Sequence, residues 1–90
     1  MNNFNIRDFI KITQSDKPAI IISECNNRLL VSIDEYNGDY LWVNINNAII
    51  MNLNCEEELS ILANFGGWFY EQHKLLYQEK ILNCIYNFLT

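Results

Sequence analysis

The side chains that could do nucleophilic chemistry in this chain are one histidine, His73, and three cysteines, Cys25, Cys55 and Cys84. A nucleophile needs its general base within hydrogen-bond reach. His73 and Cys84 lie eleven residues apart in a segment with helical spacing, which is about 16 Å along a straight helix. That pair cannot meet within the helix, and no pattern brings Cys25 or Cys55 to the histidine. The sequence therefore predicts a protein that is not an enzyme and has no catalytic residues.

Metal and cofactor binding are not indicated by spacing either. The three cysteines are isolated, no Cys-x-x-Cys pair occurs, and a single histidine adds no short ligand spacing. The consecutive acidic residues 56–58 should fan out around a helix, where they suit the first turn because the helix dipole favours negative charge there. The glycine pair at 66–67 is not followed by the Lys-Ser/Thr of a phosphate loop. The sequence predicts no metal, no cofactor and three reduced thiols.

Composition limits the class of protein further. The 90 residues predict one domain, 1–90, and half of them are hydrophobic, unlike a disordered chain. The formal net charge is −5 and the basic residues are scattered, which disfavours direct nucleic-acid binding. The longest apolar runs are four or five residues, and the N-terminus lacks the pattern of a secretory signal. We expect no membrane association and a cytoplasmic location.

Four segments after Pro18 have the character of strands: 19–25, 28–36, 40–45 and 48–53. Short Asn- or Gly-containing turns separate them, which predicts an antiparallel β-meander. The fold class expected is α+β, a four-stranded antiparallel β-meander packed on one face by C-terminal helices, with a β-rich small barrel less favoured. The start of the chain favours a short N-terminal helix through Ile6, Phe9 and Ile10, although it also fits a strand.

The strand register can be tested by asking whether apolar side chains fall on one face. A two-residue turn at 26–27 and a three-residue loop at 36–38, with the last residue left-handed, align aliphatic residues of neighbouring strands. In this register Ile33 faces Leu41. A two-residue turn at 46–47 continues the same face. The predicted core face comprises Ile20, Ile22, Leu29, Val31, Ile33, Leu41, Val43, Ile45, Ala48 and Ile50.

The C-terminal third is predicted to be helical. Asn54 followed by Glu57 resembles a capping box, and the glycine pair at 66–67 should break or kink the helix. A second helix is predicted from about Trp68 towards Phe88, with an apolar stripe that repeats every seven residues. The stripe comprises Trp68, Leu75, Leu82 and Leu89, widened by Leu76, Ile85 and Phe88.

The second face of the sheet is the predicted binding surface. It should carry Tyr40, Trp42 and Met51, whose residue types are enriched in protein interfaces. The alternative is that a helix covers this face, because small monomers seldom expose large apolar patches. The acidic hairpin would form the rim of the surface. The predicted partner-binding residues are Asp34, Glu35, Tyr36, Asp39, Tyr40, Trp42 and Met51.

These features indicate a small acidic protein that binds another, basic protein, since complementary charge speeds encounter and fixes orientation. The 14 asparagines and 13 isoleucines suggest a low-GC bacterial or phage genome. We therefore expect an inhibitor of a nucleic-acid-handling protein, either a phage anti-defence protein of the anti-CRISPR type or a toxin-immunity protein. The alternative is a structural or regulatory module that forms a homodimer through its C-terminal helix. That self-association would use Ile81, Ile85 and Phe88.

Overall fold

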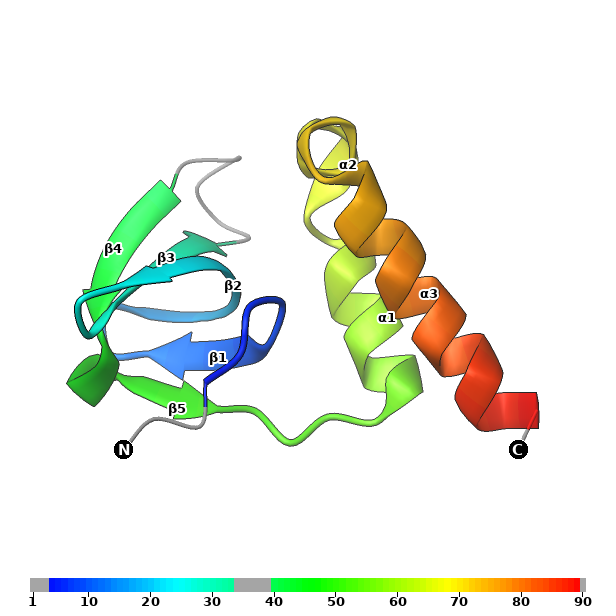
Figure 1. The fold of residues 1–90 in the computed structure, drawn as a ribbon, viewed down its shortest axis with the longest axis horizontal. Helices are drawn as coiled ribbons and strands as arrows, with labels where there is room; N and C mark the ends of the chain where they lie inside the picture. The colour runs from blue at the N-terminus through cyan, green and yellow to red at the C-terminus, as the bar shows by residue number, and fades with distance from the viewer. Residues whose placement is uncertain (1–3, 34–39, 90) are drawn as a thin grey trace. The chain divides into compact units, whose positions relative to one another are not determined.

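The computed structural model describes residues 4–33 and 40–89, and the chain divides into two compact units, Met1–Asn52 and Leu53–Thr90 (Figure 1). The first unit carries the strands and the second carries the helices, so the α+β class is confirmed. Strands and α-helices are thus segregated along the chain.

The sheet unit contains five strands where four were predicted. Every neighbouring pair is antiparallel, and the strand order is β4-β3-β2-β1-β5. The predicted meander is therefore confirmed for β2 to β4, whereas β5 pairs with β1 and not with β4. The unpredicted strand β1 pairs with the other side of β2. The strands are β1 (Phe9–Ile12), β2 (Ser15–Cys25), β3 (Arg28–Ile33), β4 (Tyr40–Asn44) and β5 (Ala48–Ile50).

A single turn of 3-10 helix, η2 (Ile45–Asn47), replaces the predicted tight turn between the last two strands. It connects β4 to β5, which stand at opposite ends of the strand order. In a flat sheet those strands would be about 19 Å apart, from four spacings of about 4.8 Å. The four residue steps from Asn44 to Ala48 span at most about 14 Å. The sheet must therefore curl, in the direction of the small barrel that the sequence favoured less (Figure 1).

The predicted N-terminal helix is wrong over its apolar part, because residues 9–12 form β1. The strand is paired on both sides, with Ile10 opposite Ala19 of β2 and Ile50 of β5. A helix of barely two turns is marginal in water. Two flanking ladders of hydrogen bonds outweigh that weak local preference, so tertiary pairing decides the conformation.

The turn of the β2–β3 hairpin is confirmed, and the register beyond it is corrected. Cys25 lies opposite Arg28, and both turn residues have positive φ, as a two-residue primed turn requires. The register then shifts between Ile21 and Ser23, so one residue of β2 bulges out of the ladder. As a result Ile21, and not Ile22, faces Val31.

The register of β3 and β4 differs by two residues from the prediction. Val31 faces Leu41, and Leu29 faces Val43. Because side chains alternate with a period of two, a shift of two residues leaves every side chain on its predicted face. The hairpin loop that was used to set the register, residues 34–39, lies outside the described residues. Trp42 is thus on the face opposite the core, as predicted.

The sheet unit has a core made of its own aliphatic side chains. The corrected register explains its membership, because the bulge places Ala19 and Ile21 in this cluster. Ile20 is also fully buried, but it lies on the other face of β2, opposite the buried Phe9 of β1. The predicted cover of one sheet face by the C-terminal helices stays a prediction. The core cluster comprises Ile10, Ile12, Ala19, Ile21, Leu29, Val31, Ile33 and Val43, with Phe4, Leu41, Ile45 and Ala48 packed against it.

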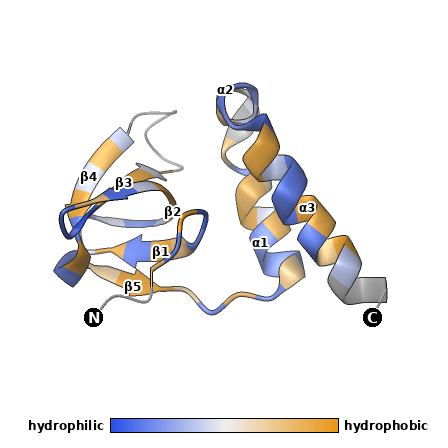
Figure 2. Ribbon diagram, viewed as in Figure 1, coloured by the Kyte–Doolittle hydropathy of each residue, from blue (hydrophilic) through white to orange (hydrophobic). Residues whose placement is uncertain are grey.

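The helical unit consists of α1 (Cys55–Ala63), α2 (Gly66–Gln72) and α3 (Lys74–Leu89), in which apolar and polar stretches alternate (Figure 2). The predicted capping box is confirmed at the start of α1. The Asn54 side chain accepts the Glu57 backbone N–H at 2.9 Å, and the Glu57 carboxylate accepts the Asn54 N–H at 3.0 Å. The start of this helix is therefore a local property of the sequence.

The predicted helix from 68 to 88 is confirmed as helical except at His73, which separates α2 from α3. The His73 N–H donates to the carbonyls of Phe69 and Tyr70 and closes α2, and the His73 carbonyl accepts the first hydrogen bond of α3 from Tyr77. The imidazole lies 4.6 Å from the Phe69 ring, between centroids. The predicted break near the glycine pair is also confirmed, because α1 ends at Ala63 and the pair begins α2.

The buried face of α3, which packs against α1, differs from the predicted stripe. Leu76 and Cys84 are buried, whereas Leu75 is 72% exposed and Leu82 is 57% exposed. The Tyr77 hydroxyl donates to the Leu62 carbonyl of α1 at 2.6 Å. The two helices are therefore joined by a mixture of apolar and polar contacts, and part of the apolar surface of α3 faces outward.

Candidate functional site

The candidate interaction surface is the outward face of β4, the strand at one end of the strand order. Tyr40 and Trp42 alternate with the inward residues Leu41 and Val43, and they are 43% and 48% exposed. Trp42 lies opposite Leu30, and Tyr40 opposite Ser32. Because side chains alternate between the two faces of a strand, Tyr40 and Trp42 lie on the same side of the sheet.

An open pocket of about 360 Å³ lies beside Trp42 at the β2–β3 turn. It is lined by Cys25, Asn26, Arg28 and Trp42. The lining combines an aromatic ring, a guanidinium group, an amide and an exposed thiol, so it offers apolar contact together with hydrogen-bond donors. The volume falls at the lower end of the range of small-ligand sites, and a pocket of this kind can also accept one side chain of a partner protein.

The predicted partner-binding set is divided by the structure. Tyr40 and Trp42 share one outward face, as predicted. Met51 is half-buried just after β5, and its N–H donates to the Phe9 carbonyl of β1 at 3.0 Å. Because β5 pairs with β1 and not with β4, the strand order does not place Met51 opposite Trp42, although Met51 follows the inward-facing pair of Ile50 and Ile10 and so lies on the predicted second face. The predicted rim, Asp34, Glu35, Tyr36 and Asp39, lies outside the described residues.

Two of the three predicted self-association residues, Ile81 and Ile85, are exposed on α3. Ile81 is 42% exposed and Ile85 is 47% exposed, while the side chain of Phe88 is outside the described part of the chain. Leu82 and Tyr86 are exposed beside them. The last turns of α3 therefore carry exposed apolar residues on several sides, which agrees with the sequence pattern.

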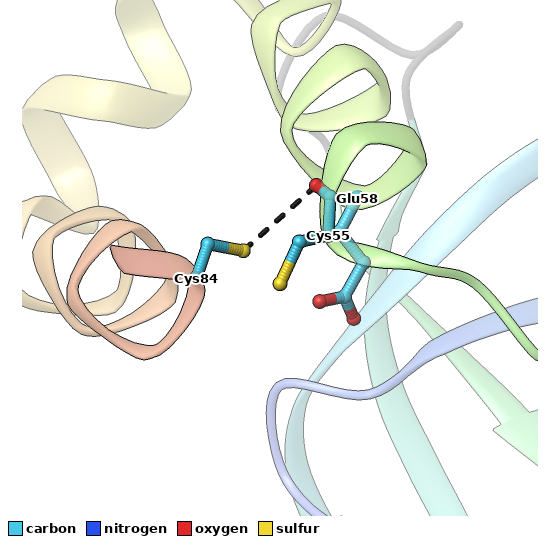
Figure 3. Close-up of side chains that lie close together, drawn as sticks. All are labelled: Cys55, Glu58 and Cys84. Atoms are coloured by element: carbon cyan, nitrogen blue, oxygen red, sulfur yellow. Dashed lines mark hydrogen bonds between the residues drawn. The ribbon is translucent and has the colours of Figure 1, made fainter. Parts of the chain in front are cut away.

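A cluster of three metal-ligating side chains lies between α1 and α3. Cys55 and Glu58 project from the first turn of α1, three residues apart, and Cys84 projects towards them from α3 (Figure 3). The two sulfur atoms and one carboxylate oxygen all lie within 4.8 Å of one another. The Cys84 thiol donates to the Cys55 carbonyl at 3.8 Å, and Lys80 donates to Glu58 at 3.1 Å.

The electrostatics of this cluster keep Cys84 protonated at neutral pH. Burial raises the pKa of the Cys84 thiol to about 11, and its hydrogen bond to Cys55 and the charge of Glu58 act in the same direction. The ammonium group of Lys80 opposes them by favouring the thiolate. Without a bound cation, this cysteine is therefore a poor nucleophile, because the thiolate is the reactive form.

The single histidine is not among these ligands. His73 is half-buried at the junction of α2 and α3, and burial lowers its pKa. Its ring contacts Phe69. The sequence placed His73 within one continuous helix, whereas the residue lies between the end of α2 and the start of α3.

Sequence reasoning missed the cluster of Cys55, Glu58 and Cys84. The spacing of Cys55 and Glu58, three residues apart in a helix, places both on one face and was an available signal. The arrival of Cys84, 29 residues after Cys55, depends on how α3 packs on α1. No local pattern encodes that approach.

Comparison with protein-family models, with curated proteins and with solved structures gives no match. Within the described residues, no helix combines the length and the apolar character needed to cross a membrane.

Proposed function

We propose that this protein acts by binding another protein through the outward face of β4. The observation that carries the proposal is the exposure of Trp42, at 48%, beside an open pocket and next to a second exposed aromatic residue, Tyr40. Large aromatic side chains are the usual anchors of protein interfaces, because they bury much area for little loss of conformational entropy. Neither residue contributes to the core cluster of the sheet unit.

The partner that we propose is a basic, nucleic-acid-handling bacterial protein, which the acidic protein inhibits without catalysing a reaction. The formal net charge of −5 supports this choice, because opposite charge speeds association and suppresses wrong partners. A phage anti-defence inhibitor of the anti-CRISPR type and a toxin-immunity protein both fit. Three cysteines, an odd number, suit the reducing cytoplasm as the place of action.

The test compares Trp42→Ala with a matched control, Ile49→Ala. Ile49 is also an exposed apolar strand residue, at 69%, but lies on β5. Tagged full-length proteins capture partners from the source bacterium, and mass spectrometry quantifies them. We expect the wild type and Ile49→Ala to recover the same basic protein and to inhibit its nuclease or toxin activity.

Trp42→Ala should weaken that binding by a factor of about 30, which corresponds to about 2 kcal/mol for an interface anchor. Circular dichroism should show an unchanged fold. Equal recovery by Trp42→Ala, or recovery of the protein alone by every variant, would contradict the proposal.

The second candidate function is self-association through α3, favoured by the exposure of Ile81 and Ile85. An amphipathic helix with an additional exposed apolar side commonly pairs with a second helix, because pairing removes that surface from water. The discriminating variant is Ile85→Asp, followed by light scattering after gel filtration. A dimer that becomes a monomer supports this candidate, whereas a wild type that is already monomeric at high concentration excludes it.

A further inference from the structure

We propose that Cys55, Glu58 and Cys84 form a binding site for a thiophilic divalent transition metal, with Zn²⁺ as the best match. Two cysteine sulfurs and one carboxylate oxygen supply three ligands, and the fourth position takes a water molecule or another exchangeable ligand. This site is separate from the β4 surface, and the proposal does not rest on the proposed binding function.

The geometry is close to what a tetrahedral ion requires. With metal–sulfur bonds of about 2.3 Å and a metal–oxygen bond of about 2.1 Å, the ligand atoms of a tetrahedral site are about 3.6 to 3.8 Å apart. The three ligand atoms of the cluster already lie within 4.8 Å of one another. The ligand atoms therefore need to approach one another by at most about 1.2 Å to close the site around an ion.

The three ligand side chains converge because α1 and α3 pack against each other. Cys55 and Glu58 share one face of the rigid first turn of α1, which the capping box fixes. Cys84 belongs to the buried face of α3 and is 2% exposed. The other two ligands, Cys55 and Glu58, are half-buried.

The charges of the site also fit a divalent ion. Two thiolates and one carboxylate carry three negative charges, so a divalent ion leaves one negative charge uncompensated. Lys80 supplies the compensating positive charge, since its ammonium group lies 3.1 Å from a Glu58 oxygen. A hydrogen bond of this kind to a ligating carboxylate also fixes its orientation, as outer partners of metal ligands usually do.

Binding displaces the thiol proton of each cysteine to solvent. The Cys84 sulfur then bonds to the metal, and its hydrogen bond to the Cys55 carbonyl is lost. Because the metal and protons compete for the same sulfur atoms, affinity should increase with pH. The bound ion would join the start of α1 to α3 and stabilise the helical unit by binding the native state.

The experiment titrates the full-length, reduced protein with Co²⁺ and follows the absorption of cobalt–thiolate charge transfer, then displaces Co²⁺ with Zn²⁺. We expect one ion per chain, with release of at least one proton at pH 7. Cys55→Ser should weaken binding by at least about 100-fold, and Glu58→Gln by about 10- to 100-fold, the range for lost or disturbed ligands. Cys84→Ser should behave like Cys55→Ser.

The matched control is Cys25→Ser, because Cys25 is an exposed cysteine of the sheet unit. It should bind Co²⁺ as the wild type does, and so should Trp42→Ala. Circular dichroism of the metal-free variants checks the fold, and Cys55→Ser keeps the test decisive if Cys84→Ser fails to fold. An absent cobalt–thiolate band in the wild type, or equal loss of binding in Cys25→Ser, would overturn the proposal.

Discussion

The sheet unit and the helical unit bury their side chains in different ways. The core cluster of the sheet unit consists of eight aliphatic residues from β1 to β4. Between α1 and α3, by contrast, buried apolar residues alternate with polar contacts: the Tyr77 hydroxyl on a carbonyl, the Lys80–Glu58 ion pair and the Cys84 thiol. An aliphatic core stabilises by area and shape, whereas polar contacts in a dry interface also bring reactive groups together. The polar contacts named here for the helical unit therefore lie between α1 and α3.

The largest expected effect tests the aliphatic core. Ile21→Ala should lower the free energy of unfolding by about 2 to 5 kcal/mol, because Ile21 is fully buried and its truncation leaves a cavity. The matched Ile49→Ala change removes the same atoms from a side chain that is 69% exposed, and should cost less than about 0.5 kcal/mol. Urea unfolding measures both. Equal losses of unfolding free energy in the two variants would mean that the bulge at Ile22 does not turn Ile21 into the core.

A second, smaller effect tests the phase of α3 with two adjacent leucines. Leu76 is 7% exposed, and Leu76→Ala should destabilise the protein by about 2 to 3 kcal/mol. Leu75 is 72% exposed, so Leu75→Ala should change stability by less than about 0.5 kcal/mol. Thermal unfolding of the two variants compares them directly. A larger loss of stability for Leu75→Ala than for Leu76→Ala would mean that the predicted heptad stripe forms the buried face of α3.

The smallest expected effect is a loss of stability at high pH, which tests the polar character of the contact between α1 and α3. The folded pKa of Cys84 is about 11, above the value of 9.0 taken for an unperturbed thiol. Between these values the unfolded chain loses the proton first, so stability is fully present below about pH 9 and declines as pH rises towards 11. The loss should be on the order of 2 kcal/mol.

The control for this pH effect is Cys84→Ala. Burial also raises the pKa of Tyr77, which adds a loss of the same sign at high pH in both proteins. The difference between wild type and Cys84→Ala therefore isolates the thiol. Parallel stability curves from pH 8 to 11 would show that Cys84 is not desolvated in the folded state.

The sequence by itself determined the features that depend on neighbouring residues. These are the α+β class, the hairpin turn at 26–27, the start of α1 at the capping box and the outward face of Tyr40 and Trp42. Each follows from local conformational preference or from the period of two in a strand. The face of Trp42 was predicted correctly even though the register was two residues out, because an even shift preserves it.

The tertiary structure alone decided the features that depend on distant partners. Residues 9–12 became a strand because β2 and β5 pair with them on both sides, and the bulge in β2 placed Ala19 and Ile21 on the face of the core cluster. The approach of Cys84 to Cys55 and Glu58 likewise depends on the packing of α3 against α1. Contacts between residues far apart in the chain override weak local preferences, because they supply hydrogen bonds and burial that a short segment cannot provide for itself.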